Sequence, residues 1–287
     1  MNSSKGNQYK YQRDGKWYKK DSLGYEAAAE VVTSYILKHS NVMHYVDYYP
    51  YKDSQDNVYA VSEDFNIPDK ILVTLYRQYK ASTGKDINKD FSRLSTEERI
   101  LKSVEIINAK YYGEYLTAML ELDSLILNED RHFNNVIYFK DKLSDTCSLA
   151  PLFDNGAAFL SDITIDYPIG ERVSALVSKV KSKPFNVSFK KQMETCEALY
   201  GQQLQILKSI DLEPVLNMLS NYYNDNILSR IETVFRIQRN KYPHLFVDSI
   251  GIDDSIISCI PSATIDRYEG DILNFCHEHK ELFSWKI

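Results

Sequence analysis

Two short stretches near the middle of the chain decide how it is interpreted: LILNEDRHFNNVIY at residues 125–138 and LAPLFDNG at residues 149–156. In the first, an apolar segment delivers Asp130, four residues intervene, and Asn135 follows. A short apolar strand then leaves, a polar turn reverses the chain, and a second apolar strand ends on Asp154, followed by an asparagine and a glycine. Paired strands of a hairpin bring their ends close together, so we expect the side-chain oxygens of Asp130, Asn135 and Asp154 to converge.

This set of side chains suits the transfer of a phosphoryl group from ATP. Asp-x-x-x-x-Asn, a hairpin and Asp-x-Gly form the pattern by which a kinase C-lobe supplies its catalytic acid and its metal ligands. Mg²⁺ takes oxygen ligands, which Asn135 and Asp154 offer, and Asp130 can face the acceptor hydroxyl. Each half of the pattern is weak alone, because Asp and Asn populate turns for local reasons. Their joint placement behind an apolar, helix-periodic segment at 113–127 makes the pattern informative.

The two residues after Asp130 have supporting roles in this interpretation. His132 is a poor ligand for Mg²⁺, and we expect it to pack against the loop and hydrogen-bond it beside the nucleotide. Arg131 can hold a backbone carbonyl or an acidic partner.

The first 65 residues have the order of a kinase N-lobe, which is a β-hairpin, a helix and further strands. Asp14-Gly15 is a strong turn signal between strands at 9–12 and 16–20. Strand alternation puts Trp17 and Lys19 on one face. A lysine there is ordinarily an edge residue that reaches solvent, but the motifs downstream call for an inward lysine.

A helix is predicted over 24–39, because its apolar residues recur at intervals of three and four and alanine favours helices. Glu26 lies in the first turn of this helix. Glu30 lies one turn later on the same face, so either glutamate can pair with Lys19, and we assign Glu26 to the pair.

The predicted fold is α+β, bilobal and protein-kinase-like, with a small β-rich N-lobe at 1–65, a larger and mostly helical C-lobe at 66–246, and a helical extension at 247–287. Further strands are expected at 43–51 and 57–61. Glu63, Asp64 and Phe65 sit where a hinge between the lobes would contact the nucleotide. Helices are expected at 71–79, 95–112, 113–127, 188–200, 213–224, 227–239 and 271–282, with a long irregular stretch at 155–184.

Composition narrows the class of protein. The chain has 287 residues, a formal charge of −6 and 44% hydrophobic residues, so a basic nucleic-acid-binding face is not expected. Its four scattered cysteines read as reduced thiols of a cytoplasmic protein. No apolar run approaches the roughly 20 residues of a membrane span, and the first residues lack the apolar core of a signal peptide.

On these motifs the chain resembles the HipA-like Ser/Thr protein kinases, in the short form that lacks an extra N-terminal subdomain. The sequence NEDRHFNN at 128–135 and LAPLFDNG at 149–156 are similar to that family's catalytic loop and metal strand, and Asp-Arg-His-x-x-Asn is shared with phosphoinositide kinases. The resemblance implies that Asp130 is the catalytic acid, that Asn135 and Asp154 hold Mg²⁺, and that Lys19 contacts the phosphates of ATP.

The N-terminal stretch SSKGNQYK at 3–10 resembles the family's phosphate loop. The resemblance implies that this loop covers the phosphates with backbone N–H groups, and that Ser3 is a site of autophosphorylation. The residues it implies for nucleotide binding are Ser3, Ser4, Gly6, Asn7 and Gln8.

Three functions remain open at this point. The first is an ATP- and Mg²⁺-dependent kinase acting on Ser or Thr of a protein, with a toxin role and an antitoxin partner. The second is a small-molecule or lipid kinase of the same fold, although the acidic charge disfavours anionic membranes. The third is a catalytically inactive nucleotide-binding or antitoxin-like interaction module.

Overall fold

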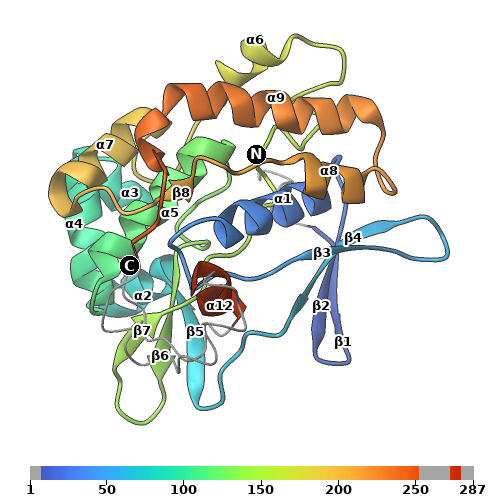
Figure 1. Cartoon of the computed structure of the whole chain (residues 1–287). Coiled ribbons are helices and arrows are strands. Elements are labelled where there is room, and N and C mark those ends of the chain that lie inside the picture. Colours follow the sequence, from blue (N-terminus) through green and yellow to red (C-terminus); the bar gives the residue numbers. More distant parts are fainter. Residues whose placement is uncertain (1–7, 252–271, 279–287) are drawn as a thin grey trace.

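The computed structural model describes residues 8–251 and 272–278. A β-rich region with one long helix forms one side of the molecule, and a larger, mainly helical region forms the other (Figure 1). This mixed arrangement confirms the predicted fold class. No helix within the described ranges is long and apolar enough to cross a membrane.

The N-terminal sheet has four antiparallel strands in the order β1-β2-β4-β3. Asp14 and Gly15 both have positive φ (51° and 75°), as a two-residue hairpin turn requires. Tyrosines pack across the face opposite Lys19; the Tyr11 and Tyr18 rings stack at 4.8 Å. The strands are β1 (Lys10–Arg13), β2 (Lys16–Lys20), β3 (Tyr49–Lys52) and β4 (Val58–Glu63).

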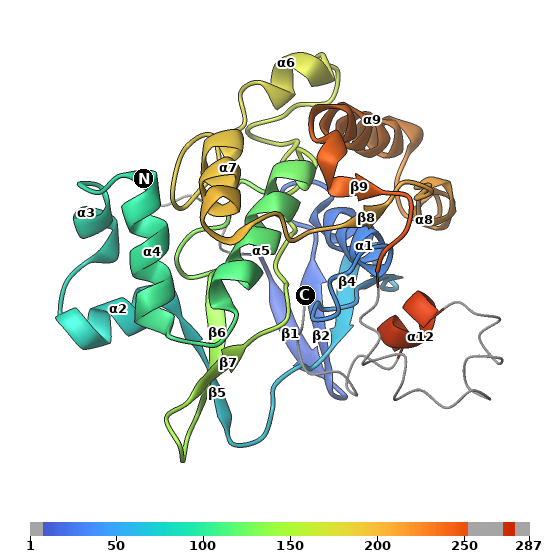
Figure 2. The same cartoon turned by 60° about the vertical axis from the view of Figure 1, so that its left-hand side comes forward.

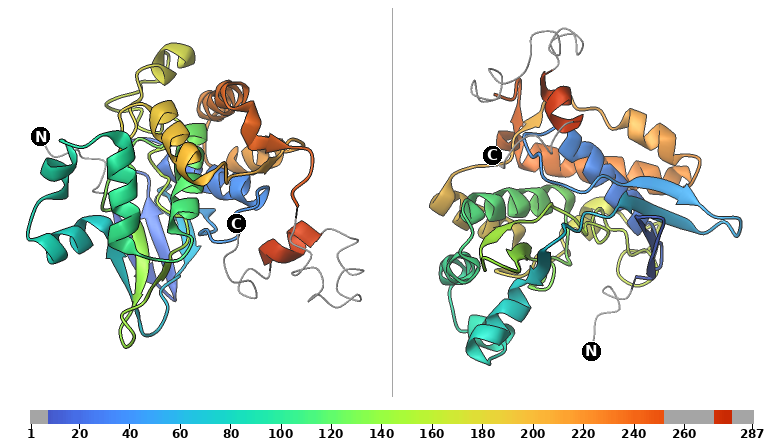
Figure 3. Two further views of the ribbon diagram at one scale, coloured as in Figure 1. Left: turned by 90° about the vertical axis from the view of Figure 1, so that its left-hand side faces the viewer. Right: turned by 90° about the horizontal axis from the view of Figure 1, so that it is seen from below.

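Helix α1 (Glu26–Lys38) packs against the inner face of this sheet, and ten of its thirteen residues are buried. Three consecutive alanines at 27–29 allow the close approach. The C-terminal end of α1 is covered by α12 (Ile272–Glu278), where the Nε2–H of His277 donates to the Ser40 carbonyl (2.8 Å) (Figure 3).

The helical region is built around α5 (Tyr112–Ile126), in which every residue except Glu114 is buried. It packs against α7 and α9, and α4 lies beside it (Figure 2). A helix that is apolar on nearly all sides belongs in a core. The other helices of this region are α2 (Leu75–Thr83), α3 (Ile87–Phe91), α4 (Thr96–Ile107), α6 (Val173–Val177), α7 (Phe189–Tyr200), α8 (Glu213–Leu219) and α9 (Asp225–Lys241).

A second antiparallel sheet, in the order β5-β6-β7, lies beneath α5 and corrects one prediction. The stretch 71–79 was predicted to be a helix, but β5 (Lys70–Thr74) pairs with β6 (Ile137–Asp141) and the helix begins only at Leu75. The side chain of Thr74 accepts the backbone N–H of Arg77 and so starts α2. Periodicity alone cannot distinguish a strand from a helix in such a short apolar run, and here its pairing with β6 makes it a strand.

Other element boundaries also differ from the prediction. The strand expected over 43–51 is confined to β3, and residues 43–48 make only an isolated bridge through Tyr45 to Leu152. The second strand of the central hairpin, β7 (Cys147–Leu149), ends five residues before Asp154. The remaining strands, β8 (Ile206–Leu207) and β9 (Phe246–Val247), form a short parallel pair.

The turn before α1 is joined to the segment that follows Asp154. The backbone N–H of Ile163 donates to the Leu23 carbonyl (3.0 Å), and the Tyr25 hydroxyl donates to the Phe159 carbonyl (2.7 Å). Gly24 lies in this junction, and a Cβ on it would sit 2.1 Å from the Ser161 carbonyl oxygen. Only glycine fits, because the obstacle is backbone.

We therefore expect Gly24→Ala to lower the free energy of unfolding by about 1–3 kcal/mol through overpacking. Urea unfolding measures the difference. The control is Ser22→Ala, an exposed change two residues away, expected to stay within about 0.5 kcal/mol of wild type. Equal stability of the two variants would contradict the packing described for this junction.

Candidate active site

The loop that carries Asp130 begins where α5 ends. Leu127 has a left-handed backbone (φ 58°) and closes the helix. The buried side chain of Asn128 donates to Asp123 (3.0 Å) and accepts the backbone N–H of Asp130 (3.2 Å). Asp123 belongs to α5, so the helix itself fixes the position of Asp130.

Arg131 connects three segments in the middle of the molecule. Its buried guanidinium makes two parallel bonds to Asp123, Nε–Oδ2 and Nη2–Oδ1, both 3.0 Å. It also donates to the Phe153 carbonyl (3.0 Å) and to Oδ1 of Asn155 (2.7 Å). The prediction that Arg131 holds a backbone carbonyl or an acidic partner is confirmed on both counts. Because one guanidinium binds both neighbours of Asp154, the two segments are held at a fixed spacing.

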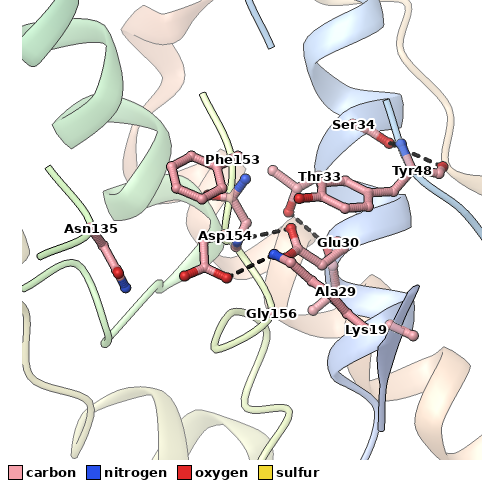
Figure 4. A network of polar contacts seen from close by, with 12 residues as sticks. Lys19, Ala29, Glu30, Thr33, Ser34, Tyr48, Asn135, Phe153, Asp154 and Gly156 are labelled. Atoms are coloured by element: carbon pink, nitrogen blue, oxygen red, sulfur yellow. Dashed lines mark hydrogen bonds and ion pairs between the residues drawn. The ribbon is translucent and has the colours of Figure 1, made fainter. Parts of the chain in front are cut away.

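Lys19 points inward from β2 and is 7% exposed. Its Nζ lies 2.7 Å from Oε1 of Glu30 and 2.7 Å from Oδ1 of Asp154 (Figure 4). The rings of Tyr48 and Phe153 flank the ammonium, with centroids 5.1 and 5.7 Å away. Burial alone would lower the pKa of Lys19, but the two carboxylates reverse this and raise its pKa well above the ordinary value. Lys19 is therefore charged at neutral pH.

Asp154 carries the complementary charge. Its backbone is left-handed (φ 61°), a conformation that aspartate tolerates better than most residues with a Cβ. Burial would raise the pKa of its carboxyl, but Lys19 lowers that pKa to about 2, so the group is ionised at neutral pH. In Figure 4 the carboxylate stands between Lys19 on one side and Asn135 on the other.

The partner of Lys19 on α1 is Glu30, and the assignment of Glu26 to this role is wrong. Glu30 is fully buried, and its second oxygen accepts the backbone N–H of Asn155 (2.8 Å). Glu26 instead accepts backbone N–H groups of residues 22–24, the shortest at 2.7 Å. The turn before a helix leaves such donors without backbone partners, and a carboxylate in the first turn satisfies them.

A cleft of about 330 Å³ brings most of the predicted site residues together. Asn135 donates from Nδ2 to the Asp130 carbonyl (2.8 Å), which leaves its Oδ1 for a ligand. The predicted residues that line the cleft are Gln8, Lys19, Glu26, Asp130, His132, Asn135 and Asp154. The proposed phosphate-loop residues Ser3, Ser4, Gly6 and Asn7 lie outside the described residues.

The predicted hinge residues, 63–65, are not among the residues that line this cleft. Asp64 accepts the indole N–H of Trp17 (3.3 Å), which ties the first hairpin to the end of β4. The ring of Phe65 lies 5.4 Å from that of Phe153, next to the metal-binding candidate. Their contact with a nucleotide stays a prediction.

A lysine and a histidine flank the carboxylate of Asp130. Nζ of Lys183 lies 3.4 Å from Oδ1, and Nε2 of His132 lies 3.8 Å from Oδ2. Sequence reasoning missed Lys183, which comes from the stretch predicted only as irregular. No spacing rule links it to Asp130, since 53 residues separate them.

The oxygens present fit a magnesium ion. Asp154 offers an ionised carboxylate, and among the described residues no side chain or backbone N–H donates to its Oδ2. Asn135 offers Oδ1, and one or two protein oxygens completed by phosphates and water is how Mg²⁺ is usually bound. Groups of three or more His, Cys, Asp or Glu side chains arranged for a metal do not occur in the part of the chain that the structure describes.

Comparison with known proteins shows the fold. The structure resembles that of the Helicobacter pylori proinflammatory kinase CtkA, with a TM-score of 0.56 over 84% of this chain and 92% of that one, at 14% identity. The chain therefore has a kinase fold. A weaker likeness is to HipA of Shewanella oneidensis MR-1, solved with HipB and operator DNA, with a TM-score of 0.42 over 83% of this chain and 61% of that one, at 11% identity. No family model and no curated protein sequence matches the chain.

A titratable group next to the site links β2, α1 and the loop between α8 and α9. Oδ1 of Asp21 accepts the backbone N–H of Ala27 (2.6 Å), and its Oδ2 accepts the hydroxyl of Tyr223 (2.6 Å). Burial raises the pKa of Asp21 to about 7. In the unfolded chain this pKa is about 3.9, so the folded state binds the proton more tightly. Its contribution to stability is complete below the unfolded value and is lost as the pH rises to about 7.

We expect Asp21→Asn to gain stability relative to wild type as the pH is raised from 5 to 8, because asparagine has no proton to lose. Urea unfolding at both pH values measures this. Asp14→Asn, in an exposed turn, is the control and should show no such trend. A difference between Asp21→Asn and wild type that is the same at both pH values would refute the assignment.

Proposed function

We propose that the chain transfers the γ-phosphoryl group of ATP to a Ser or Thr hydroxyl of a protein, in the presence of Mg²⁺. One observation carries the proposal: the buried ammonium of Lys19 is shared by Glu30 and Asp154 at the edge of a cleft that Asp130 and Asn135 also line. A lysine–glutamate pair and a metal-binding aspartate are the parts that a kinase must have in place.

The proposal puts the nucleotide in this cleft. Lys19 would contact its phosphates, and Gln8 and Lys10, the cross-strand neighbour of Lys19 on β1, line the same cleft. Asn135 and Asp154 would hold Mg²⁺, which neutralises phosphate charge when bound. The hinge residues 63–65 would contact the base. We propose residues 1–65 as the N-lobe, 66–246 as the C-lobe and 247–287 as a C-terminal extension.

Asp130 would orient the acceptor. Its carboxylate lines the cleft beside Asn135, and its backbone carbonyl is held by that residue's amide. A hydroxyl that donates to Asp130 has its oxygen lone pair free to attack phosphorus. Phosphoryl transfer needs little else from a protein beyond positioned phosphates and compensated charge.

The choice of a protein acceptor, a toxin role and an antitoxin partner rest on the likeness of the motifs to HipA-like kinases. Autophosphorylation at Ser3 belongs to the same proposal. The fold shared with CtkA, which is described as a kinase, supports phosphoryl transfer in general.

Incubation with radiolabelled ATP and Mg²⁺ tests the function directly. We expect label on the chain or on an acceptor, and a loss of about 10³-fold or more in Asp154→Asn and Asp130→Asn, because each removes a group that acts on the transferring phosphoryl group. EDTA should abolish transfer. Equal labelling by wild type and both variants would refute the proposal.

The same preparation separates the alternatives. Acceptors offered in parallel are a mixture of proteins, small hydroxyl compounds and phosphoinositide vesicles, so the labelled class identifies the substrate class. Thermal unfolding with ATP and Mg²⁺ is measured beside turnover. Stabilisation by ATP without any labelling would instead establish a nucleotide-binding module.

A matched pair of variants tests the assignment on α1. Glu30→Gln and Glu26→Gln make the same chemical change one helical turn apart, but only Glu30 contacts Lys19. We expect Glu30→Gln to lower kcat by about 10²-fold, the scale of losing one preorganised charge, and Glu26→Gln to lose at least ten times less. Steady-state kinetics measures both, and the reverse order would contradict the geometry.

A further inference from the structure

The loop at 182–187, which carries Lys183, is held firmly although it lies between helices. Phe185 is completely buried, and its ring packs edge-on against Phe133 of the catalytic loop at 5.9 Å. The carbonyl of Phe185 accepts from Nη1 of Arg99 on α4 (2.8 Å). The loop is thus anchored to the same segment that carries Asp130.

Further bonds fix the backbone on both sides of Lys183. The hydroxyl of Ser182 donates to the Asn186 carbonyl (2.7 Å), and the buried amide of Gln192 donates to the carbonyl of Lys183 itself (3.2 Å). The amide of Asn186 reaches Thr96 on α4 (2.7 Å). The backbone of Lys183 is therefore fixed, whereas its side chain is 44% exposed and can move.

The contact of Lys183 with Asp130 does little for stability. At 3.4 Å and with an exposed lysine, such a pair is largely screened by water and stabilises the fold little. A loop with four anchoring bonds nevertheless keeps the ammonium within reach of Asp130, which lines the cleft. Because the contact adds little to the stability of the fold, the position of Lys183 beside Asp130 points to a role in the reaction.

Charge balance in the cleft gives that role. The ammonium of Lys19 is already shared by Glu30 and Asp154, so this trio has a net charge of −1, and Asp130 adds another. The triphosphate of ATP brings several more negative charges to the same place. Lys183 is in contact with Asp130, and its long flexible stem lets its ammonium move from Asp130 to a phosphoryl oxygen.

We propose that Lys183 is a catalytic residue that binds the transferring phosphoryl group, an inference that rests on the proposed function. In the step, a lone pair of the acceptor oxygen forms the new O–P bond, and the bond between γ-phosphorus and the bridging oxygen breaks with its electron pair going to ADP. The acceptor proton passes to the carboxylate of Asp130. The ammonium of Lys183, displaced from Asp130 by the acceptor hydroxyl, donates to an equatorial phosphoryl oxygen while charge spreads over it.

The test compares Lys183→Met, Lys183→Arg and Lys179→Met. Lys179 lies in the same stretch, and its exposed ion pair is with Glu171, away from Asp130. Transfer from ATP to myelin basic protein and to the chain itself gives kcat and KM. Thermal unfolding, with and without ADP, Mg²⁺ and aluminium fluoride, reports folding and affinity for a transition-state mimic.

We expect Lys183→Met to lower kcat about 10²- to 10³-fold, the range for losing one donor to a developing anion, with KM for ATP changed less than threefold. It should keep stabilisation by ADP and Mg²⁺ but lose the additional stabilisation by aluminium fluoride. Lys183→Arg should recover at least a tenth of the wild-type rate, and Lys179→Met should match wild type.

Three results overturn the inference. If wild type transfers phosphate and Lys183→Met is within threefold of it, the role of Lys183 is refuted while the proposed function stands. The same holds if the whole loss lies in KM for the acceptor, since Lys183 then only docks the substrate. A wild-type chain that transfers no phosphate refutes the proposed function, and this inference with it.

Discussion

The rest of the structure depends on one buried cation between two carboxylates. Lys19 comes from a strand, Glu30 from a helix and Asp154 from a segment more than a hundred residues later. A buried charge without partners is costly, and removing one partner of a buried pair typically costs about 3–5 kcal/mol. The packing of α1 on the first sheet, and of both on the central loop, must therefore bring these three groups within hydrogen-bond distance.

Arg131, which forms a second buried ion pair with Asp123, helps to fix the left-handed backbone of Asp154. Arg131 binds the carbonyl of Phe153 and the side chain of Asn155, while Glu30 accepts the backbone N–H of Asn155. The residues on both sides of Asp154 are thus fixed from two directions. A left-handed aspartate is retained when its surroundings determine it to this extent. The same buried contacts therefore stabilise the fold and fix the geometry of the site.

The sequence predicts the parts of this site whose residues lie in local patterns. Strand alternation puts Lys19 on one face of its strand, and the motif of Asp130, Asn135 and Asp154 downstream calls for that lysine to point inward. The choice of Glu26 over Glu30 was wrong, because both lie on one helix face and only the tertiary position of Lys19 distinguishes them. Lys183 could not be found either, since the contacts that place it against Asp130 come from distant segments.

The junction between residues 23–25 and 159–163 has a consequence for how such a molecule can be regulated. In kinases generally, outward displacement of the glutamate-bearing helix is a route to an inactive state. Here that helix is tied by backbone bonds at its start and by Glu30 to Asn155 in its second turn. Displacing α1 outward would break all of these bonds at once. The start of α1 is therefore a fixed part of the cleft, joined to the segment after Asp154 by backbone as well as side-chain contacts.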